Sequence, residues 1–141
     1  MSRGAAGKSP RARHCDAADA RKRLGNAEKY LEVAALVAGE DSLESHNVAT
    51  GLAVLAGIAA ADAACCKALG ESSRGPDHRD AATFLRRITP GGDAAANHFE
   101  RLVGLKDKAH YSFLNVSSQD RTGALRRTGQ LVEFAREVLE R

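Results

Sequence analysis

The stretch SLESHNVATGLAVLAGIAAADAACCKALG, residues 42–70, constrains the fold more than any other part of the chain. From Val48 to Cys66 it is apolar on nearly every face of a helix, and Gly70 marks its end. A helix that is hydrophobic all round is buried on several sides. The other segments must cover it, so we expect this stretch to be the central helix of a helical domain.

A membrane span is the rival interpretation of this stretch, because about 20 apolar residues suffice to cross a bilayer. The run is mostly alanine, with Gly51 and Gly57, and is far less lipophilic than a run of leucine or isoleucine. Asp62 lies inside it, where a carboxylate costs ~3 kcal/mol on membrane-insertion scales. We therefore expect the core helix of a soluble protein and no membrane partner.

The apolar residues elsewhere in the chain also recur at helical spacing. Asp16 is suited to cap a first amphipathic helix, and Ser117 with Asp120 resembles the capping box of the last one. No run of strand length alternates between apolar and polar residues. The sequence predicts an all-α fold, an up-and-down four-helix bundle with one additional short helix. Besides residues 42–70, the expected helices span about 16–39, 80–88, 93–108 and 117–141.

The positive charge of the chain is concentrated near its N-terminus. The first 23 residues hold seven Arg and Lys against two Asp, whereas the whole chain has a net charge of +3. Residues 1–14, MSRGAAGKSPRARH, have no periodic apolar face and are rich in Gly, Ser, Pro and Arg. We expect a disordered basic tail at 1–14 and one helical domain at 15–141. Such a tail either grips phosphates or is simply solvated.

The three cysteines, Cys15, Cys65 and Cys66, give no even disulfide framework. Neighbouring residues on a helix point about 100° apart, so Cys65 and Cys66 do not form a normal bridge. A chain of 141 residues can bury enough core to fold without staples. We therefore expect reduced thiols and a cytoplasmic protein. The adjacent cysteines 65 and 66 have no CxxC or HxxxH motif as a partner, so we expect no metal site and no cofactor.

Polar residues in the central helix and in one loop are candidates for a site. Asp62 lies on the apolar stripe of the central helix, where a buried carboxylate needs a cation or several donors. We expect an ion pair with an arginine of another helix; the alternative is that Asp62 orients His110 or His78. The loop SRGPDHR places Arg74, His78 and Arg79 in one connection, where they can form an anion site.

Four segments of the chain carry a family resemblance. They are the alanine-rich LAVLAGIAAADAACCKALGE, the loop SRGPDH, the segment LVGLKDKAHYS and the terminal RTGALRRTGQLVEFAREVLE. Together they look like the bacterial HEPN superfamily, over roughly residues 16–140. The resemblance implies a helical bundle, frequently a homodimer, that often acts on RNA in toxin and antitoxin or defence systems. RNA and a partner protein encoded nearby are the further partners that it implies.

The catalytic signature of that superfamily is an arginine followed, after four to six residues, by a histidine near the end of the third long helix. His110 occupies the histidine place, but the positions for the arginine hold Leu105, Gly104 and Val103. Arg101 lies too far before His110 to take that place. The motif is therefore broken: its histidine is present, but its arginine is missing.

The residues around His110 leave two functions open. RNA cleavage without a metal needs a base for the ribose 2′-hydroxyl, an acid for the leaving oxygen and a cation near the phosphorane. The candidate catalytic residues are His110, Lys106 and Asp62, and a two-fold dimer can bring two copies of His110 together. The candidate binding residues are Lys108, Tyr111, Arg74, His78 and Arg79.

The broken motif favours a helical interaction module, either non-catalytic or weakly RNA-binding, in a toxin and antitoxin or defence system. A lysine is a point charge and lacks the guanidinium fork that suits phosphate, so Lys106 and Lys108 replace the missing arginine poorly. The alternative function is a metal-independent ribonuclease with a degenerate motif that uses His110 across a dimer. In a purely structural interpretation, His110 and Tyr111 end a helix and pack under the following loop.

Overall fold

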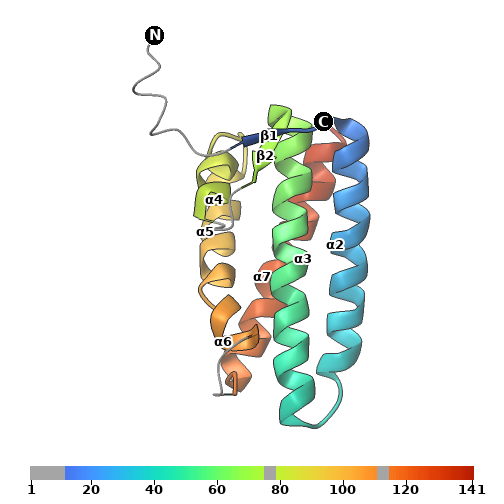
Figure 1. The fold of residues 1–141 in the computed structure, drawn as a ribbon, viewed down its shortest axis with the longest axis vertical. Coiled ribbons are helices and arrows are strands. Elements are labelled where there is room, and N and C mark those ends of the chain that lie inside the picture. Colours follow the sequence, from blue (N-terminus) through green and yellow to red (C-terminus); the bar gives the residue numbers. More distant parts are fainter. Residues whose placement is uncertain (1–11, 75–78, 111–114) are drawn as a thin grey trace.

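The structure is a computed structural model, and it describes residues 12–74, 79–110 and 115–141 of the chain (Figure 1). Within those ranges most residues are α-helical, which confirms the all-α prediction, and one small sheet accompanies the helices. The elements in chain order are β1 (Ala12–His14), α2 (Ala17–Ala38), α3 (Leu43–Leu69), β2 (Glu71–Ser73), α4 (Arg79–Arg86), α5 (Gly92–Val103), α6 (Lys106–His110) and α7 (Ser118–Leu139).

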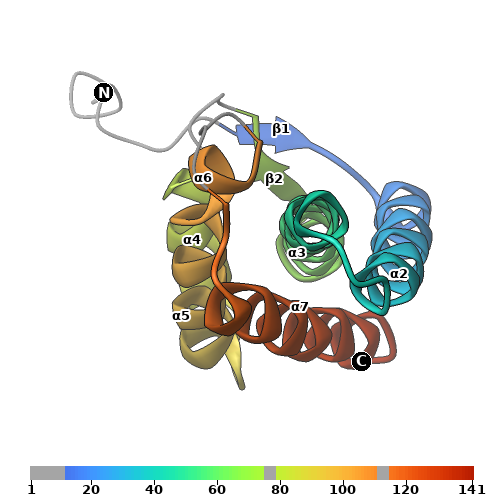
Figure 2. The ribbon, with the colours of Figure 1, turned by 90° about the horizontal axis from the view of Figure 1, so that it is seen from below.

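Helix α3 lies at the centre of the helical assembly. Seen along the helices, α2 and α7 flank it, and the arm formed by α4, α5 and α6 lies on a further side (Figure 2). By length and composition alone α3 could cross a membrane, but 72% of its most apolar 18-residue stretch is buried inside the protein. Its apolar surface is therefore covered by the other helices, as in the core helix of a soluble protein.

Reciprocal hydrogen bonds explain where α2 and α7 begin. The Asp16 carboxylate accepts from the Asp19 N–H at 2.8 Å, and the Asp19 carboxylate accepts from the Asp16 N–H at 3.0 Å. Ser117 and Asp120 form the same arrangement before α7. Such capping boxes satisfy N–H groups that have no partner within the helix. Both predicted starts are confirmed, and α3 ends at Gly70, whose φ of 73° favours glycine.

Small residues on α3 let α5 and α7 approach its backbone closely. The Thr128 hydroxyl of α7 donates to the Ala53 carbonyl at 2.6 Å, in a fully buried contact. A Cβ on Gly57 would lie only 2.6 Å from Leu102 Cδ1 of α5. The small side chains of α3 are therefore used for packing within one chain.

The helix expected over residues 93–108 is interrupted, so that prediction is wrong in its extent. α5 ends at Val103, and α6 is a separate short helix. Between them the Leu105 N–H donates to the Leu102 carbonyl at 2.9 Å, which is the i to i−3 bond of a tighter turn. Gly104 lies at this point, and glycine costs a helix about 1 kcal/mol relative to alanine.

A two-stranded antiparallel sheet joins the N-terminal segment to the end of α3, although the sequence predicts no strand. The paired residues of β1 and β2 are Ala12 with Ser73, Arg13 with Ser72 and His14 with Glu71. Each strand has three residues, which is too short for an alternating pattern to be recognised. Residues 12–14, expected in the disordered tail, therefore belong to the sheet, and residues 1–11 lie outside the described residues.

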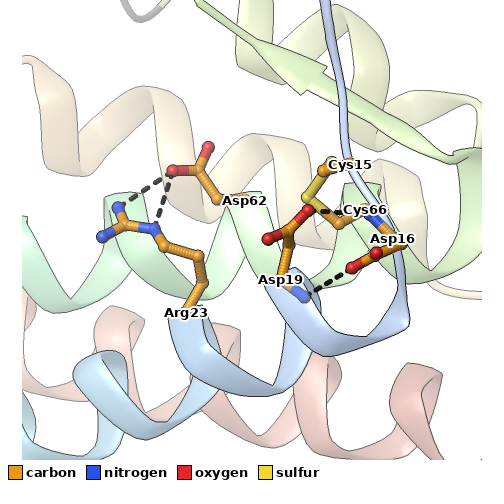
Figure 3. The surroundings of a disulfide bond; sticks show 6 residues. All are labelled: Cys15, Asp16, Asp19, Arg23, Asp62 and Cys66. Carbon is orange, nitrogen blue, oxygen red and sulfur yellow. Dashed lines mark hydrogen bonds and ion pairs between the residues drawn. A yellow bond between two sulfur atoms is a disulfide. The ribbon is translucent and has the colours of Figure 1, made fainter.

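A disulfide joins Cys15, at the start of α2, to Cys66, near the end of α3 (Figure 3). The prediction of three reduced cysteines is wrong for these two, and Cys65 is the free, buried thiol. The helices α2 and α3, of 22 and 27 residues, run in opposite directions (Figure 1). The chain therefore folds back and brings the two cysteines, 51 residues apart, to a Cα–Cα distance of 5.3 Å.

Candidate functional site

His110 lies at the end of α6 and packs on the first half of α3. A Cβ on Gly51 would be 3.0 Å from His110 Cε1 and 3.2 Å from Nε2. The imidazole ring therefore lies against the α3 backbone at Gly51, where an alanine would crowd it. His110 as a whole remains exposed to solvent. The contact gives His110 a packing role, and its catalytic role stays a prediction.

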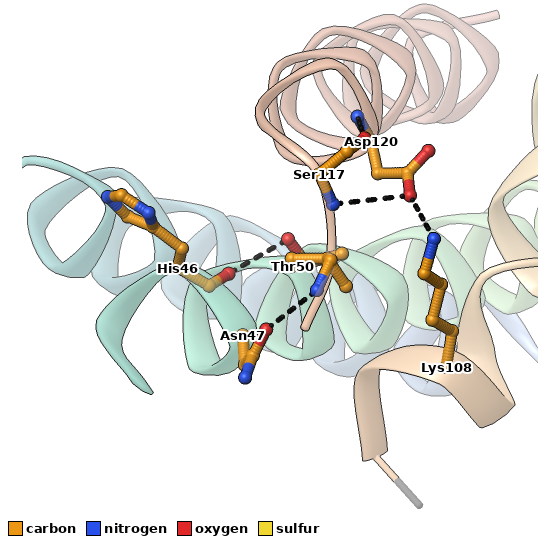
Figure 4. Close-up of polar contacts among 7 residues, drawn as sticks. His46, Asn47, Thr50, Lys108, Ser117 and Asp120 are labelled. Atoms are coloured by element: carbon orange, nitrogen blue, oxygen red, sulfur yellow. Dashed lines mark hydrogen bonds and ion pairs between the residues drawn. The ribbon is translucent and has the colours of Figure 1, made fainter. Parts of the chain in front are cut away.

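Lys108 is engaged in the start of the next long helix. Its Nζ lies 2.9 Å from Asp120 Oδ2, and the same oxygen accepts from the Ser117 N–H (Figure 4). The hydrogen bond from Lys108 is the main cause that lowers the pKa of Asp120 below its ordinary value. Lys106, by contrast, forms no ion pair with any of the residues that the structure describes. Of the two candidate lysines, Lys108 has its charge already paired.

Asn47 ties the segment after α6 to α3. Its Oδ1 accepts from the Val116 N–H at 2.9 Å, and its Nδ2 donates to Asn115 Oδ1 at 2.8 Å. Nearby, the Thr50 hydroxyl donates to the His46 carbonyl at 2.9 Å within α3 (Figure 4). Asn47 therefore holds residues 115 and 116, which lie just before α7, against α3. Residue 111, the candidate binding tyrosine, lies outside the described residues.

Asp62 pairs with Arg23 of α2 (Figure 3). The guanidinium Nη2 and Nε donate to Asp62 Oδ2 at 2.9 and 3.1 Å. The Asp62 side chain is 14% exposed and that of Arg23 is 32% exposed, so the pair is partly buried. The predicted ion pair with an arginine of another helix is confirmed. At 1.5 Å per residue, Asp62 lies roughly 16 Å along α3 from Gly51, so Asp62 and His110 do not form one site.

A cleft beside the Arg23–Asp62 pair contains two adjoining cavities. The larger, of about 590 Å³, is lined by Arg13, His14, Cys15, Asp19, Lys22, Arg23, Asn26, Asp62, Cys66 and Ser72. The smaller, of about 230 Å³, is lined by Arg13, Arg23, Ile58, Asp62, Ser73, Arg74, Ala81 and Phe99. Arg74, predicted for an anion site, is therefore brought to a cavity. Of its predicted companions, His78 and the side chain of Arg79 lie outside the described part of the chain.

A basic patch that the sequence did not reveal lies on α5 and α7. It consists of His98, Arg101, Arg126 and Arg127, and Arg127 Nη1 lies 3.3 Å from His98 Nδ1. Burial, followed by the charges of the three arginines, lowers the pKa of His98. Burial, followed by the charges of Arg101 and Arg126, lowers the pKa of Arg127. None of these arginines forms an ion pair with an acid among the described residues, so like charges gather there without paired carboxylates.

The available signals for this patch were local and weak. The arginine pair at 126 and 127 precedes Thr128 on α7, and His98 and Arg101 have the i, i+3 spacing that places two side chains on one face of a helix. Each of these two patterns is also common on an ordinary solvent-exposed helix. Only the packing of α5 against α7 brings the two together.

Within the described residues, no group of three or more His, Cys, Asp or Glu side chains is placed to hold a metal ion. Comparison with protein-family models, with curated proteins and with solved structures finds nothing that matches the chain. Function must therefore be inferred from the residues of the chain itself and from the resemblance that they carry.

Proposed function

We propose that the chain is a HEPN-like helical interaction module that binds RNA without cutting it. Its RNA-binding surface is the basic patch of His98, Arg101, Arg126 and Arg127. Guanidinium groups that lie close together repel one another, and a bound polyanion relieves this repulsion. Their planar fork also suits phosphate oxygens. The observation that carries the proposal is the 3.3 Å contact between Arg127 and His98, with two more arginines acting on both groups.

The ribonuclease alternative has weaker support from the geometry. Lys108 is paired with Asp120, and Asp62 lies far along α3 from the His110 contact. His110 and Lys106 are left as neighbours on α6, one turn apart. A base and a single lysine lack the bidentate cation that stabilises a phosphorane best. Binding without cleavage is therefore the better account.

The bundle topology belongs to the same proposal. We take α2, α3, the arm of α4 to α6, and α7 as the four arms of an up-and-down four-helix bundle. Successive arms run in opposite directions in Figure 1, which supports this assignment. A partner protein encoded nearby and a role in a toxin and antitoxin or defence system are proposed from the HEPN resemblance.

A homodimer is proposed on the same ground, and the structure suggests where to test it. The large apolar side chains most exposed among the described residues are Leu36, Leu43 and Val48, at 70%, 55% and 52%. They lie around the turn between α2 and α3. If two chains associate there, Leu36→Glu should convert a dimer into a monomer in light scattering. A dimer that survives Leu36→Glu together with Val48→Glu would place the interface elsewhere.

A cytoplasmic location is proposed because RNA, the proposed ligand, is found there. Disulfides in reducing compartments are usually transient or redox-sensing. In that setting the Cys15–Cys66 bridge is expected to open and close with the redox state of its surroundings.

The function is tested by incubating RNA with the protein in EDTA and running binding and cleavage assays in parallel. A chain that begins at residue 12 removes the basic residues 1–11 but keeps β1. We expect this chain to shift RNA in a gel and leave it intact, and Arg126→Gln with Arg127→Gln to abolish the shift at moderate salt. Cleavage that persists in EDTA and disappears in His110→Ala would favour the ribonuclease instead.

A further inference from the structure

The smaller cavity of the cleft has an excess of positive charge on its walls. Arg13 of β1 and Arg74, directly after β2, line it and form no ion pair with any acid in the described part of the chain. Arg23 also lines it but is paired with Asp62. Two guanidinium groups are therefore left to attract an anion into a space of about 230 Å³.

A hydroxyl on the same cavity wall points to the same class of ligand. The Ser73 Oγ is buried and makes no hydrogen bond within the described structure. A buried hydroxyl without a partner is unfavourable, and an oxyanion beside it would accept its hydrogen bond. Two guanidinium groups and a hydroxyl form a donor set that suits a phosphoryl group. Because drug-sized ligands need about 300 Å³ or more, this cavity has room for a phosphoryl group, and a larger group attached to it would lie outside the cavity.

Arg13 is held at the cavity by the disulfide that follows it in the chain. It lies two residues before Cys15, on a strand of three exposed residues. The other described attachments of this segment are its pairing with β2 and the hydrogen bond from the Cys15 N–H to the Gly70 carbonyl. A two-stranded sheet is only marginally stable alone. Both cysteines line the larger cavity, so a small dithiol has a route to the sulfur atoms.

We propose that the smaller cavity binds phosphate, either free or as a terminal phosphomonoester, and that reduction of the Cys15–Cys66 disulfide weakens this binding. A dithiol gives two electrons and two protons to the disulfide, which becomes two cysteine thiols, and the dithiol itself becomes a disulfide. β1 then loses its covalent anchor, and Arg13 is no longer fixed at the cavity. The phosphate site uses different residues from the basic patch, so its test does not depend on the proposed RNA binding.

The remaining cysteine does not replace the broken bridge. Cys65 is buried, and burial together with the charge of Asp62 raises the pKa of its thiol to about 12. It therefore stays protonated near neutral pH, whereas thiol–disulfide exchange requires a thiolate. Reduction therefore opens the Cys15–Cys66 bridge without forming another one, and reoxidation restores the same bridge.

Calorimetric titration of the oxidised full chain with sodium phosphate, at constant ionic strength, tests the site. We expect one saturable site per chain. Arg13→Gln and Arg74→Gln should each bind about tenfold more weakly, because each loses a charge-assisted hydrogen bond. Arg121→Gln is the matched control and should bind like the wild type, because Arg121 lies on α7 and lines neither cavity of the cleft. Dithiothreitol should weaken the wild type about as much as Arg13→Gln does, and it should not change Cys15→Ser.

A ribodinucleotide with and without a 5′-phosphate separates the two sources of the ligand. Tighter binding of the phosphorylated form than of free phosphate assigns the site to a nucleic-acid end, and the reverse order assigns it to free phosphate. The site is overturned if the oxidised chain shows no saturable binding of phosphate, or if both arginine variants bind it unchanged. Equal affinity of the oxidised and reduced wild type overturns the redox control. Both arginines are exposed, and melting curves check that the variants fold.

Discussion

The imidazole ring of His110 rests on the α3 backbone at Gly51, where a Cβ would come within 3.0 Å of the ring. His110 is exposed, so its ring can turn aside when a methyl group is introduced. Alanine also favours a helix over glycine by about 1 kcal/mol. We expect Gly51→Ala to keep the unfolding free energy within about 1 kcal/mol of the wild type while shifting the NMR signals of the His110 ring. Unchanged ring signals would contradict the contact.

Two other helical glycines give a matched comparison of packing. At Gly57 a Cβ would lie 2.6 Å from Leu102 Cδ1, and Leu102 is itself buried, so Gly57→Ala should cost about 1–3 kcal/mol. At Gly129 a Cβ would meet nothing within 4 Å, so Gly129→Ala should stabilise by about 0.5–1 kcal/mol. Denaturant unfolding measures both. If Gly57→Ala is as stable as Gly129→Ala, α3 and α5 do not pack as described.

The ion pair of Arg23 and Asp62 should stabilise the protein more than an exposed pair does. Asp62→Asn leaves a partly buried guanidinium without its counter-charge and should lower the unfolding free energy by about 1–3 kcal/mol. The double variant with Arg23→Gln should lose less than the sum of the two single variants. Lys29 and Glu32 form an exposed control pair, with side chains 69% and 59% exposed. Glu32→Gln should change stability by no more than about 0.5 kcal/mol.

The ion pair of Lys108 and Asp120 predicts how stability changes with pH. The hydrogen bond from Lys108 lowers the pKa of Asp120, so the unfolded chain binds this proton more tightly than the folded chain. The stabilisation is therefore complete above the unfolded pKa of about 4 and is lost as pH falls through the lower folded pKa. We expect Asp120→Asn to be less stable than the wild type by about 0.5–1 kcal/mol at neutral pH, because it loses the ion pair with Lys108.

The difference between Asp120→Asn and the wild type should shrink as the pH is lowered below about 4, which chemical unfolding at several pH values measures. Asp41→Asn is the control, because Asp41 is an exposed residue between α2 and α3. A difference that stays constant down to acid pH would mean that the charge of Asp120 does not contribute.

The Cys15–Cys66 disulfide closes a long loop and should add about 2–4 kcal/mol to stability. Cys15→Ser should melt below the oxidised wild type, and dithiothreitol should bring the wild type down to the level of the variant. The variant should itself be insensitive to dithiothreitol. Thiol titration of the oxidised chain in denaturant should find one free thiol, that of Cys65. Finding three thiols in the air-oxidised protein would contradict the bridge.

The long helices could be predicted because their signals are local. Asp16 and Ser117 lie next to the residues that they cap, and the apolar positions between the caps repeat at helical spacing. The ion pair of Asp62 could be predicted in kind, because a carboxylate on an apolar stripe needs a cation. Its partner Arg23 could not be named, because that depends on how α2 lies against α3.

The cleft and the patch could not be predicted, because both depend on contacts between distant segments. Cys15 meets Cys66 only because α2 and α3 run in opposite directions, and a count of cysteines carries no such information. Likewise, His98 meets Arg127 only where α5 packs against α7. The break at Gly104 was visible as a glycine, but glycine inside a helical pattern is often tolerated.

The affinity for single-stranded RNA as a function of salt tests the central claim most directly. The chain should begin at residue 12, because the basic residues 1–11 can mimic the effect of the patch. Each phosphate that the protein neutralises on a single strand contributes about −0.7 to the slope of log affinity against log salt. The number of arginines that contact phosphate can therefore be read from the change in slope.

We predict that Arg101→Gln, Arg126→Gln and Arg127→Gln together flatten the slope by about two units. Lys108→Gln should change it little, because the Lys108 charge is already paired. His110→Ala should leave it unchanged, because the phosphate contacts are assigned to the basic patch and His110 lies against α3 at Gly51. The account would be contradicted if the triple arginine variant had the same slope as the wild type and if RNA were cut in EDTA only when His110 is present.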